Sequence, residues 1–426
     1  QTCVDVALEY RRLGDAAACH RVLEESRHAA KPVGAPRVGP LAQVLDPLTG
    51  PTPVQLTERW IFPNRLVEYQ ALLTWVRALP SCAPLHALLG TWLYAHDRPR
   101  EAITAWQHAT SLDPSDWISQ RNLGLAIMNH TPDADAAWGH YRRALALRPD
   151  HPRLRYETDQ LAARRGVPLA ERLELLAPDG RPVDRADALT TYLQPPLSTD
   201  DLEAARDLLA SHTFQPWEGG EGQTLAAWDR CHLLATRRLL DAGRPERAVH
   251  MAEEAFDVPR SLGEQRHPLA NTAALHLALG DALAAAERPV EATEQWGRAA
   301  DQSGDFVQMS AEPFSEQTHY SIVALHRLGD HARAAALTDK LEAYLQTWTA
   351  SPARVDFFAT SLPSLLLFPA DVRLVRERRA RLMEAQLIHA RDNKDQRALE
   401  VLNGLLAKAP DYTLALDLRN EFVRGH

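Results

Sequence analysis

Residues 84–114 read PLHALLGTWLYAHDRPREAITAWQHATSLDP, and this stretch decides the fold. Its apolar residues follow a helical period on both sides of a short polar turn. Gly90 in the first helix and Ala102 in the second are small, and larger side chains there would push the two helices apart. Trp106 fills the wedge between this pair and the next helix, and Pro114 cannot continue a helix. The stretch therefore predicts a helix-turn-helix pair.

The same residue types return at the same offsets further along the chain. The second copy holds Leu123, Gly124, Ala137, Tyr141, Ala144 and Pro149, and Pro149 lies 35 residues after Pro114. A third copy holds Leu279, Gly280, Leu283, Ala292, Trp296 and Ala299, without a closing proline. The final stretch keeps Ala398, Leu402, Leu405 and Pro410, without the glycine. These copies indicate a repeat protein.

The pattern resembles the tetratricopeptide repeat, whose period is about 34 residues. Each helix pair leaves an apolar face open and must stack on its neighbours. We find no alternating apolar and polar run that predicts a strand. The sequence predicts an all-α protein, a right-handed α-solenoid of tetratricopeptide-like helix pairs.

Two proline-containing breaks interrupt the repeats, at residues 30–56 and 178–199. We expect a helix pair at 1–29 that ends a preceding region, a Pro/Gly-rich linker or strap at 30–63, tetratricopeptide-like repeats at 64–178, a break at 179–199, and irregular repeats with distinctive loops at 200–426. The irregular pairs are expected at 152–165 with 168–177, 224–241 with 245–256, 315–328 with 331–347, and 372–391 with 394–408 as the last pair. Ser198, Thr199 and Asp200 predict the start of a short helix at 200–210.

The composition excludes several classes of function. The chain has 426 residues and a net charge of −9 without a basic run, which argues against nucleic-acid binding. It has no apolar stretch of about 18 residues, so we expect no membrane span. The four cysteines, Cys3, Cys19, Cys82 and Cys231, form neither a CxxC pair nor a zinc-like cluster with histidine. We therefore expect reduced thiols, a cytoplasmic location, no metal and no cofactor.

The chain also lacks the common catalytic motifs. Neither GxGxxG, GxxxxGK[ST], HExxH nor GxSxG occurs in a suitable context. We expect no reaction from this chain alone, and no catalytic residue is named. The N-terminal QTCVDVALEYRRLGD lacks a methionine and a signal-peptide core, and its pattern is that of a helix interior. We expect the chain to be part of a longer protein.

Three loops have compositions that a simple spacer does not need. Loop 1, residues 214–222, reads FQPWEGGEG and contains Trp217, Glu218 and Glu221. An aromatic ring beside two carboxylates is a common way to hold a sugar. The alternative is a tight turn in which Trp217 is buried against the next helix and the acids cap that helix.

Loop 2, residues 262–268, reads LGEQRHP, and its Glu264 and His267 could orient a ligand or exchange a proton. The alternative is that Glu264 or Asn271 caps the following helix, with His267 half-buried. Loop 3, residues 304–320, includes Ser315, Glu316, His319 and Tyr320. Glu316 and Tyr320 are four residues apart and would share a helix face. The alternative is capping by Ser315 together with packing.

Each loop follows the second helix of one pair and leads into the next pair. Equivalent loops of a solenoid line up along one edge, so we expect the three loops to be neighbours. The candidate binding residues are Trp217, Glu218, Glu221, Glu264, His267, Glu316 and Tyr320. Most glycoside hydrolases use a pair of carboxylates for catalysis, so a carbohydrate site is one hypothesis.

The phrases FQPWEGGEG, LGEQRHPLA, SGDF, PFSEQTHY and VDFFATSLPSLLLF resemble a bacterial family in which a galactose-mutarotase-like β-sandwich precedes a tetratricopeptide array. The resemblance runs from about Arg59 to the C-terminus. It departs from the family at His319 and Arg266, where the family has an aromatic residue and lysine. The resemblance implies a carbohydrate-related setting but no assigned reaction.

Two functions follow from these patterns. In the first, the chain is a binding and scaffolding module of a larger carbohydrate-related protein, and its partner is another domain of that protein or a separate protein. In the second, its acidic and aromatic loops contribute to a carbohydrate-binding or glycoside-hydrolase site that a β-sandwich domain completes, with a carbohydrate as the ligand. We favour the first. Neither involves nucleic acid or a membrane.

Overall fold

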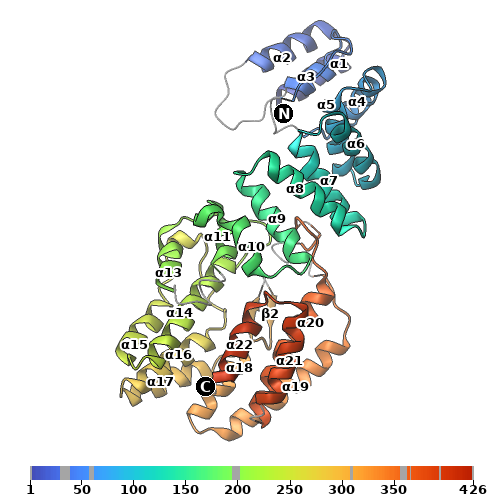
Figure 1. The fold of residues 1–426 in the computed structure, drawn as a ribbon. Coiled ribbons are helices and arrows are strands. Elements are labelled where there is room, and N and C mark those ends of the chain that lie inside the picture. The colour runs from blue at the N-terminus through green and yellow to red at the C-terminus, as the bar shows by residue number, and fades with distance from the viewer. Residues whose placement is uncertain are drawn as a thin grey trace. The chain divides into compact units, whose positions relative to one another are not determined.

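The fold is described from a computed structural model, shown in Figure 1. The described residues are 2–28, 39–56, 62–193, 202–307, 310–355, 362–364, 366–392 and 395–424. Within these ranges the regular secondary structure is helical, apart from one short hairpin. None of the described helices combines the length and the apolar character that crossing a membrane requires.

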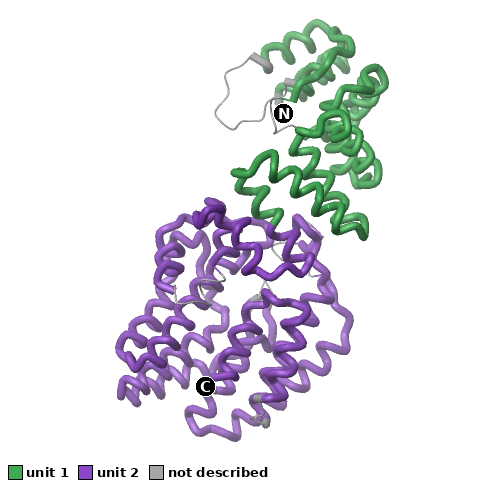
Figure 2. Tube along the Cα trace, viewed as in Figure 1, with its two compact units in different colours: residues 1–158 green, residues 159–426 purple. Residues whose placement is uncertain are grey.

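The chain divides into two compact units, residues 1–158 and 159–426, which Figure 2 shows in different colours. The boundary falls inside helix α9 (Pro152–Arg164). The subdivision expected at 179–199 stays a prediction. Each unit is described by itself below.

Unit 1 consists of successive helices that pack in pairs. They are α1 (Thr2–Arg12), α2 (Ala16–His28), α3 (Gly39–Leu45), α4 (Leu66–Ala78), α5 (Ala83–Ala95), α6 (Pro99–Leu112), α7 (Trp117–His130), α8 (Ala134–Leu147) and the first part of α9. Helix α3 lies in the segment that the sequence predicted as a linker, where no helix was expected. The rest of that prediction falls partly on residues 29–38 and 57–61, outside the described residues.

The small-residue pattern places the helices of each pair in close contact, as the sequence predicted. A Cβ atom added to Gly90 would lie 2.7 Å from Cδ1 of Trp106. One added to Gly124 would lie 2.8 Å from Cδ2 of Tyr141, whose side chain is fully buried. Only glycine leaves space for these rings. Each aromatic ring therefore requires a glycine at the facing position of the paired helix.

Unit 2 continues the same construction. After the end of α9 come α10 (Leu169–Leu176), the short η1 (Pro178–Gly180), α11 (Ala186–Tyr192), α13 (Leu202–Ser211), α14 (Gln223–Asp241), α15 (Pro245–Glu254), η2 (Arg260–Leu262), α16 (Ala273–Ala285), α17 (Pro289–Ala300), α18 (Thr318–Arg327), α19 (His331–Ala350), α20 (Val372–Asp392), α21 (Asp395–Lys408) and α22 (Thr413–Arg424). The third predicted repeat is α16 with α17. A Cβ on Gly280 would lie 2.5 Å from Cδ1 of Trp296.

The first helices of the successive pairs form an inner layer in unit 2. Helix α14 contacts α16, α16 contacts α18, and α18 contacts α20, while α15, α17, α19 and α21 pair with them. Helix α22 follows α21 and shares an apolar core with α20 and α21 through Leu382, Leu402, Leu418 and Phe422. The inner layer is therefore α14, α16, α18, α20 and α22.

Three features of unit 2 correct the sequence analysis. A single helix, α22, follows the last pair α20–α21, where the sequence analysis expected no helix. The stretch after α17 contains a short antiparallel hairpin, β1 (Asp305–Val307) with β2 (Ser310–Glu312), in which Phe306 lies opposite Ala311. Helix α18 begins at Thr318, so Glu316 precedes it and does not share a helical face with Tyr320. The helix predicted at 200–210 is α13. Ser198, Thr199 and Asp200, which were predicted to start it, lie outside the described residues.

Candidate functional site

Loops 1 and 2 are joined through the carboxylate of Glu264. The backbone N–H groups of Gly222 and Leu225 donate to it at 2.7 and 2.8 Å, and the Thr224 hydroxyl also donates to it. These donors belong to the N-cap residue and the first turn of α14, so Glu264 caps α14 from the neighbouring loop. The helix after loop 2 is capped separately, because Asn271 Oδ1 accepts from the N–H of Ala273 at 2.9 Å.

The Trp217 ring in loop 1 lies against the backbone of Gly220, where an added Cβ would be 2.0 Å from the ring. Trp217 is half-buried, whereas Glu218 and Glu221 are exposed. Gly219 and Gly222 have φ angles of 79° and 75°, which L-residues adopt at a cost. Loop 1 is therefore a tight turn in which the half-buried Trp217 has two exposed acids close to it in sequence.

Loops 2 and 3 also touch one another. The exposed His267 ring stacks on Phe306 of β1, with centroids 3.9 Å apart and an interplanar angle of 16°. Asn271 donates its backbone N–H to Asp305 Oδ1 at 2.9 Å and its side-chain N–H to the carbonyl of Gly304 at 2.8 Å. The three loops thus follow one another along one edge of unit 2.

Glu316 of loop 3 faces the protein interior. It shares the guanidinium of Arg379 with Glu312, at 2.7 Å for each carboxylate, and all three side chains are largely buried. Arg379 also lies over the Trp348 ring, 5.5 Å from its centroid. Burial lowers the pKa of Arg379, but the two carboxylates outweigh this effect and leave its pKa raised. Arg379 therefore joins α20 to the hairpin through Glu312 and to the segment before α18 through Glu316.

The candidate residues do not converge on one site. Glu264 caps the N-terminus of α14, Glu316 pairs with Arg379, and His267 stacks on Phe306. The seventh residue, Tyr320, lies on α18 at the inner cavity described next. Only Trp217, Glu218 and Glu221 stay together near solvent.

A cavity of about 660 Å³ lies between the inner helices of unit 2. Its lining comes from all five of them: Arg237 on α14, Asp281 on α16, Tyr320 on α18, His389 on α20 and Glu421 on α22. Both signs of charge and several aromatic rings line it. A polar, partly enclosed cavity of this kind suits a ligand that presents charged and apolar groups together.

Two histidines and a phenylalanine form one wall of this cavity. The rings of His389 and Phe422 stack with centroids 4.2 Å apart, and His319 lies 5.8 Å from His389. Burial, reinforced by the neighbouring His389 and Arg237, lowers the pKa of His319 to about 3. His319 is therefore neutral at neutral pH. Burial raises the pKa of Tyr320, which keeps its hydroxyl protonated.

Ion pairs join α22 and the residues just before it to α14 and α10. Arg230 of α14 donates to both oxygens of Asp417, at 2.5 and 2.8 Å, and Arg237 donates to Glu421 at 2.7 Å. Asp411, just before α22, accepts from Arg172 of α10 and from the backbone N–H of Leu169. We call this set of contacts the seam, and it closes the inner helices into a ring.

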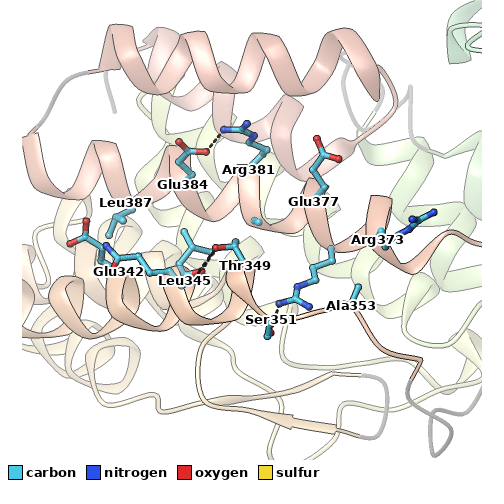
Figure 3. Close-up of a pocket in the computed structure, with 13 residues that line it drawn as sticks. Glu342, Leu345, Thr349, Ser351, Ala353, Arg373, Glu377, Arg381, Glu384 and Leu387 are labelled. Atoms are coloured by element: carbon cyan, nitrogen blue, oxygen red, sulfur yellow. Dashed lines mark hydrogen bonds and ion pairs between the residues drawn. The ribbon is translucent and has the colours of Figure 1, made fainter.

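A second groove, of about 640 Å³, runs between α19 and α20 on the same unit (Figure 3). Leu345 and Leu387 contribute apolar surface, and the walls carry charged side chains of both signs. Arg381 and Glu384 pair at 2.7 Å within one wall. The groove combines an apolar floor with charged walls.

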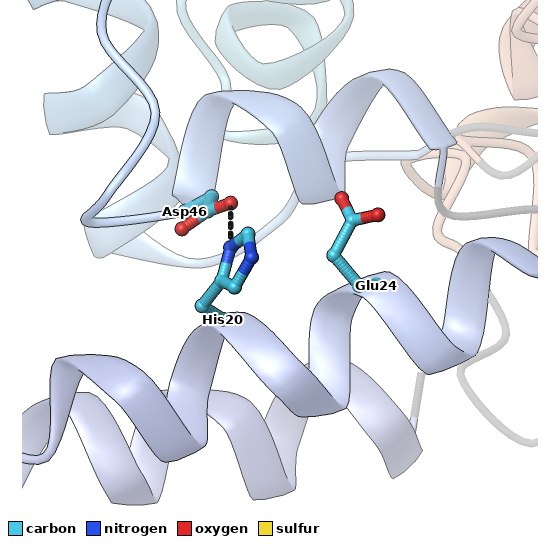
Figure 4. Close-up of side chains that lie close together, drawn as sticks. All are labelled: His20, Glu24 and Asp46. Carbon is cyan, nitrogen blue, oxygen red and sulfur yellow. Dashed lines mark hydrogen bonds and ion pairs between the residues drawn. The ribbon is translucent and has the colours of Figure 1, made fainter.

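Unit 1 brings three potential metal-ligating side chains together, as Figure 4 shows. Ligand atoms of His20, Glu24 and Asp46 all lie within 4.8 Å of one another. Asp46 is buried, and its carboxylate accepts from Leu48, Thr49 and His20. Those hydrogen bonds already give Asp46 a role in joining α2 to the end of α3.

The sequence analysis missed the seam, most of the cavity and the His20 group. The paired residues of the seam are 184 to 242 positions apart, so no local spacing reveals them. The one available signal was the acidic residues of 411–424, Asp411, Asp417 and Glu421, in a segment for which no helix was predicted.

Comparison with protein families finds a match to the tetratricopeptide repeat at residues 88–152 and 233–306. The first stretch lies in unit 1 and the second in unit 2. Both contain repeats recognised above from their glycine and aromatic residues. Each unit therefore contains a stretch that matches the tetratricopeptide repeat.

Solved structures with detectable likeness include a tetratricopeptide repeat protein from Parabacteroides merdae ATCC 43184, at 14% identity over 56% of this chain and 86% of that chain, with a TM-score of 0.29. YrrB, described as a tetratricopeptide protein with an unusual peptide-binding site, shows 14% identity over 55% and 92%, with a TM-score of 0.25. Naa15/Naa10 bound to HypK-THB shows 15% identity over 84% and 61%, with a TM-score of 0.34.

Proposed function

We propose that this chain, which carries tetratricopeptide repeats in both of its units, is a scaffold that binds a protein partner on its inner helices. The partner is another domain of the same protein or a separate protein. The observation that carries the proposal is the inner cavity of unit 2, with its lining from all five inner helices. A stack of repeats presents the same helix of every pair to one side, so this side collects side chains from distant parts of the sequence.

The chemistry of that lining favours a peptide or protein segment. Asp281 and Arg327, which pair at 3.1 Å, are about one-third and one-half exposed, and each can exchange its protein partner for a group of a ligand. Tyr320 and the exposed His326 add aromatic lining to the same cavity. A polypeptide supplies charged and apolar side chains at such separations, and tetratricopeptide repeats bind proteins.

The test compares two matched charge reversals in the full chain. Arg327→Glu changes the cavity, whereas Arg298→Glu changes the outer helix α17, where Arg298 pairs with Glu294 and is similarly exposed. Proteins that co-purify with each variant are quantified by mass spectrometry. We expect Arg327→Glu to lose specific partners that the unaltered chain and Arg298→Glu both retain. Equal partner sets for all three chains would contradict binding at the inner helices.

The second candidate is a carbohydrate site at loop 1. One observation favours it: Trp217 is half-buried beside the exposed Glu218 and Glu221. The other loop acids do not add to it, because Glu264 and Glu316 have protein partners. A glycan panel with the full chain and its Glu218→Gln variant tests this candidate, and unchanged glycan binding in the variant would remove Glu218 from the site.

The location proposed for the chain is the cytoplasm. All four cysteines are free thiols, and Cys19 and Cys231 are buried. Burial raises the pKa of the Cys231 thiol to about 11, so it stays protonated and unreactive at neutral pH. Unpaired, protonated thiols fit a reducing compartment.

A further inference from the structure

Helix α22 has two different faces. One face carries Leu418 and Phe422 and packs into the apolar core that α22 shares with α20 and α21. The other face carries Asp417 and Glu421, one helical turn apart, and points toward α14. Asp411, two residues before the helix begins at Thr413, adds a third carboxylate. All three acids of residues 411–424 therefore pair with arginines of α10 and α14.

The joint between α22 and α14 differs from the other joints of the inner layer. The neighbouring inner helices share apolar cores, such as the one that Leu277 of α16, Leu325 of α18 and Leu387 of α20 form. Among the described residues, the apolar clusters of unit 2 do not join α14 to α22. The ring is closed there by long arginine side chains that bridge to carboxylates.

A polar joint of this kind separates more easily than an apolar one. Glu421 and Asp417 are 14% and 19% exposed, so water reaches the pairs from the edge of the seam. Separated charges regain hydration, whereas separated apolar faces do not. Opening at this seam leaves α22 attached to α20 and α21 through its apolar face and uncovers Arg230 and Arg237.

We propose that the seam opens, and that the uncovered face of α14 binds an acidic amphipathic helix of a protein partner in the place of α22. The inference rests on the proposed function, and it names the chemistry of the partner and the element that competes with it. The partner helix presents two carboxylates one turn apart to Arg230 and Arg237. The chain's own α22 is the template for this choice, because its acids already satisfy the same arginines.

Tethering sets the strength that the partner needs. A helix on the same chain competes at an effective concentration of the order of millimolar, so a free helix of equal affinity binds weakly while the seam is intact. Substitution of the acids on α22 should therefore increase the affinity of the chain for an added acidic helix. Substitution of the arginines on α14 should abolish that affinity. This asymmetry distinguishes a binding site from a purely structural joint.

The experiment uses the full chain and a fluorescein-labelled peptide with the sequence of residues 411–424, DYTLALDLRNEFVR. The control peptide carries lysine in place of its two acids at the positions of Asp417 and Glu421. Fluorescence anisotropy measures binding to the unaltered chain and to the double variant Asp417→Lys, Glu421→Lys. We expect the variant to bind the acidic peptide at least tenfold more tightly than the unaltered chain does, and to bind the control peptide no better.

A second double variant, Arg230→Glu with Arg237→Glu, should lose the acidic peptide and gain the control peptide. Equal affinity of the acidic peptide for the unaltered chain and for the variant with Asp417→Lys and Glu421→Lys would overturn the proposal. Equal affinity of one chain for the acidic and the control peptide would overturn it too. Far-UV circular dichroism verifies that each variant is folded. If partner proteins depend on Arg327 but the acidic peptide does not bind, the proposed function stands and this inference fails.

Hydrogen exchange tests the seam even if charge reversal prevents folding. Asp417→Asn with Glu421→Gln removes the charges and keeps the shapes, and Glu400→Gln at an exposed position of α21 is the matched control. We expect amides of α22 and α14 to exchange at least threefold faster in the first variant, with α16 to α18 unchanged, and no effect of the control. Unchanged exchange in α22 and α14 would show that the seam does not hold the ring closed.

Discussion

Replacing Gly124 with alanine tests the packing principle on which the repeats depend. Gly124 lies within α7, and an added Cβ would be 2.8 Å from Cδ2 of Tyr141 and 3.0 Å from the carbonyl oxygen of Ala137. Carbon atoms pack at about 3.5–4.0 Å, so either the Tyr141 ring or the helix must move. The ring is fully buried, and its hydroxyl donates to Glu157 at 3.3 Å, which opposes its movement.

Two effects of opposite sign decide the result. Alanine is favoured over glycine by about 1 kcal/mol in a helix interior. Overpacking a well-filled core costs about 1–3 kcal/mol. The balance predicts that Gly124→Ala lowers the free energy of unfolding by about 1 kcal/mol.

Gly139 in α8 provides the control, because it lies in the paired helix of the same repeat and an added Cβ there would meet nothing within 4 Å. Gly139→Ala should therefore raise the free energy of unfolding by about 1 kcal/mol. The measurement is urea denaturation of the full chain, followed by far-UV circular dichroism. If both variants are equally stable, close packing of glycine against the aromatic wedge does not govern the repeat.

Three further outcomes are expected. Glu264→Ala should lower the free energy of unfolding by about 1–2 kcal/mol in a thermal melt, because α14 loses its cap, whereas Glu221→Ala should change it by less than about 0.5 kcal/mol. Arg379→Met should cost about 2–3 kcal/mol in urea denaturation, since it leaves two largely buried carboxylates without their shared cation. Burial raises the pKa of Glu157, but the charges of Arg121 and Arg153 outweigh it and leave that pKa below its ordinary value of 4.5. Its stabilising contribution is therefore present above pH 4.5 and is lost as the pH falls through the lower folded-state pKa; Glu157→Gln should show a weaker loss of stability in acid.

The repeats were predictable because their packing depends on residues that are close in sequence. Gly90 and Trp106 are 16 positions apart, and Gly280 and Trp296 have the same spacing, so one contact leaves one recurring pattern. Helix α22 carries no glycine and no such aromatic partner, which explains why it was missed. The hairpin at Phe306 has only three residues in each strand, too few for an alternating pattern to be distinct.

The candidate site was less predictable, since a side chain's role depends on which distant group reaches it. Glu264 was a candidate because an acid beside a histidine in loop 2 could bind a ligand or exchange a proton. Its partners are instead backbone N–H groups at the start of α14, about 40 positions earlier. The sequence analysis expected the three loops to be neighbours, and their contacts agree with this. That expectation needed only the order of the helices, which the repeats supply. The closure of the ring by Arg230 and Asp417 could not be read from local sequence at all, since 187 positions separate them.

Site-specific photo-crosslinking from the inner helices tests the central claim most directly. A benzophenone amino acid replaces His326, which is exposed at the cavity on α18, or Thr293, which is exposed on the outer helix α17. The full chain is irradiated in the cells that produce it, and the crosslinked proteins are identified by mass spectrometry. The account predicts a specific crosslinked partner from position 326 and none from position 293. Crosslinks from position 293 alone, or the same proteins from both positions, would contradict binding on the inner helices.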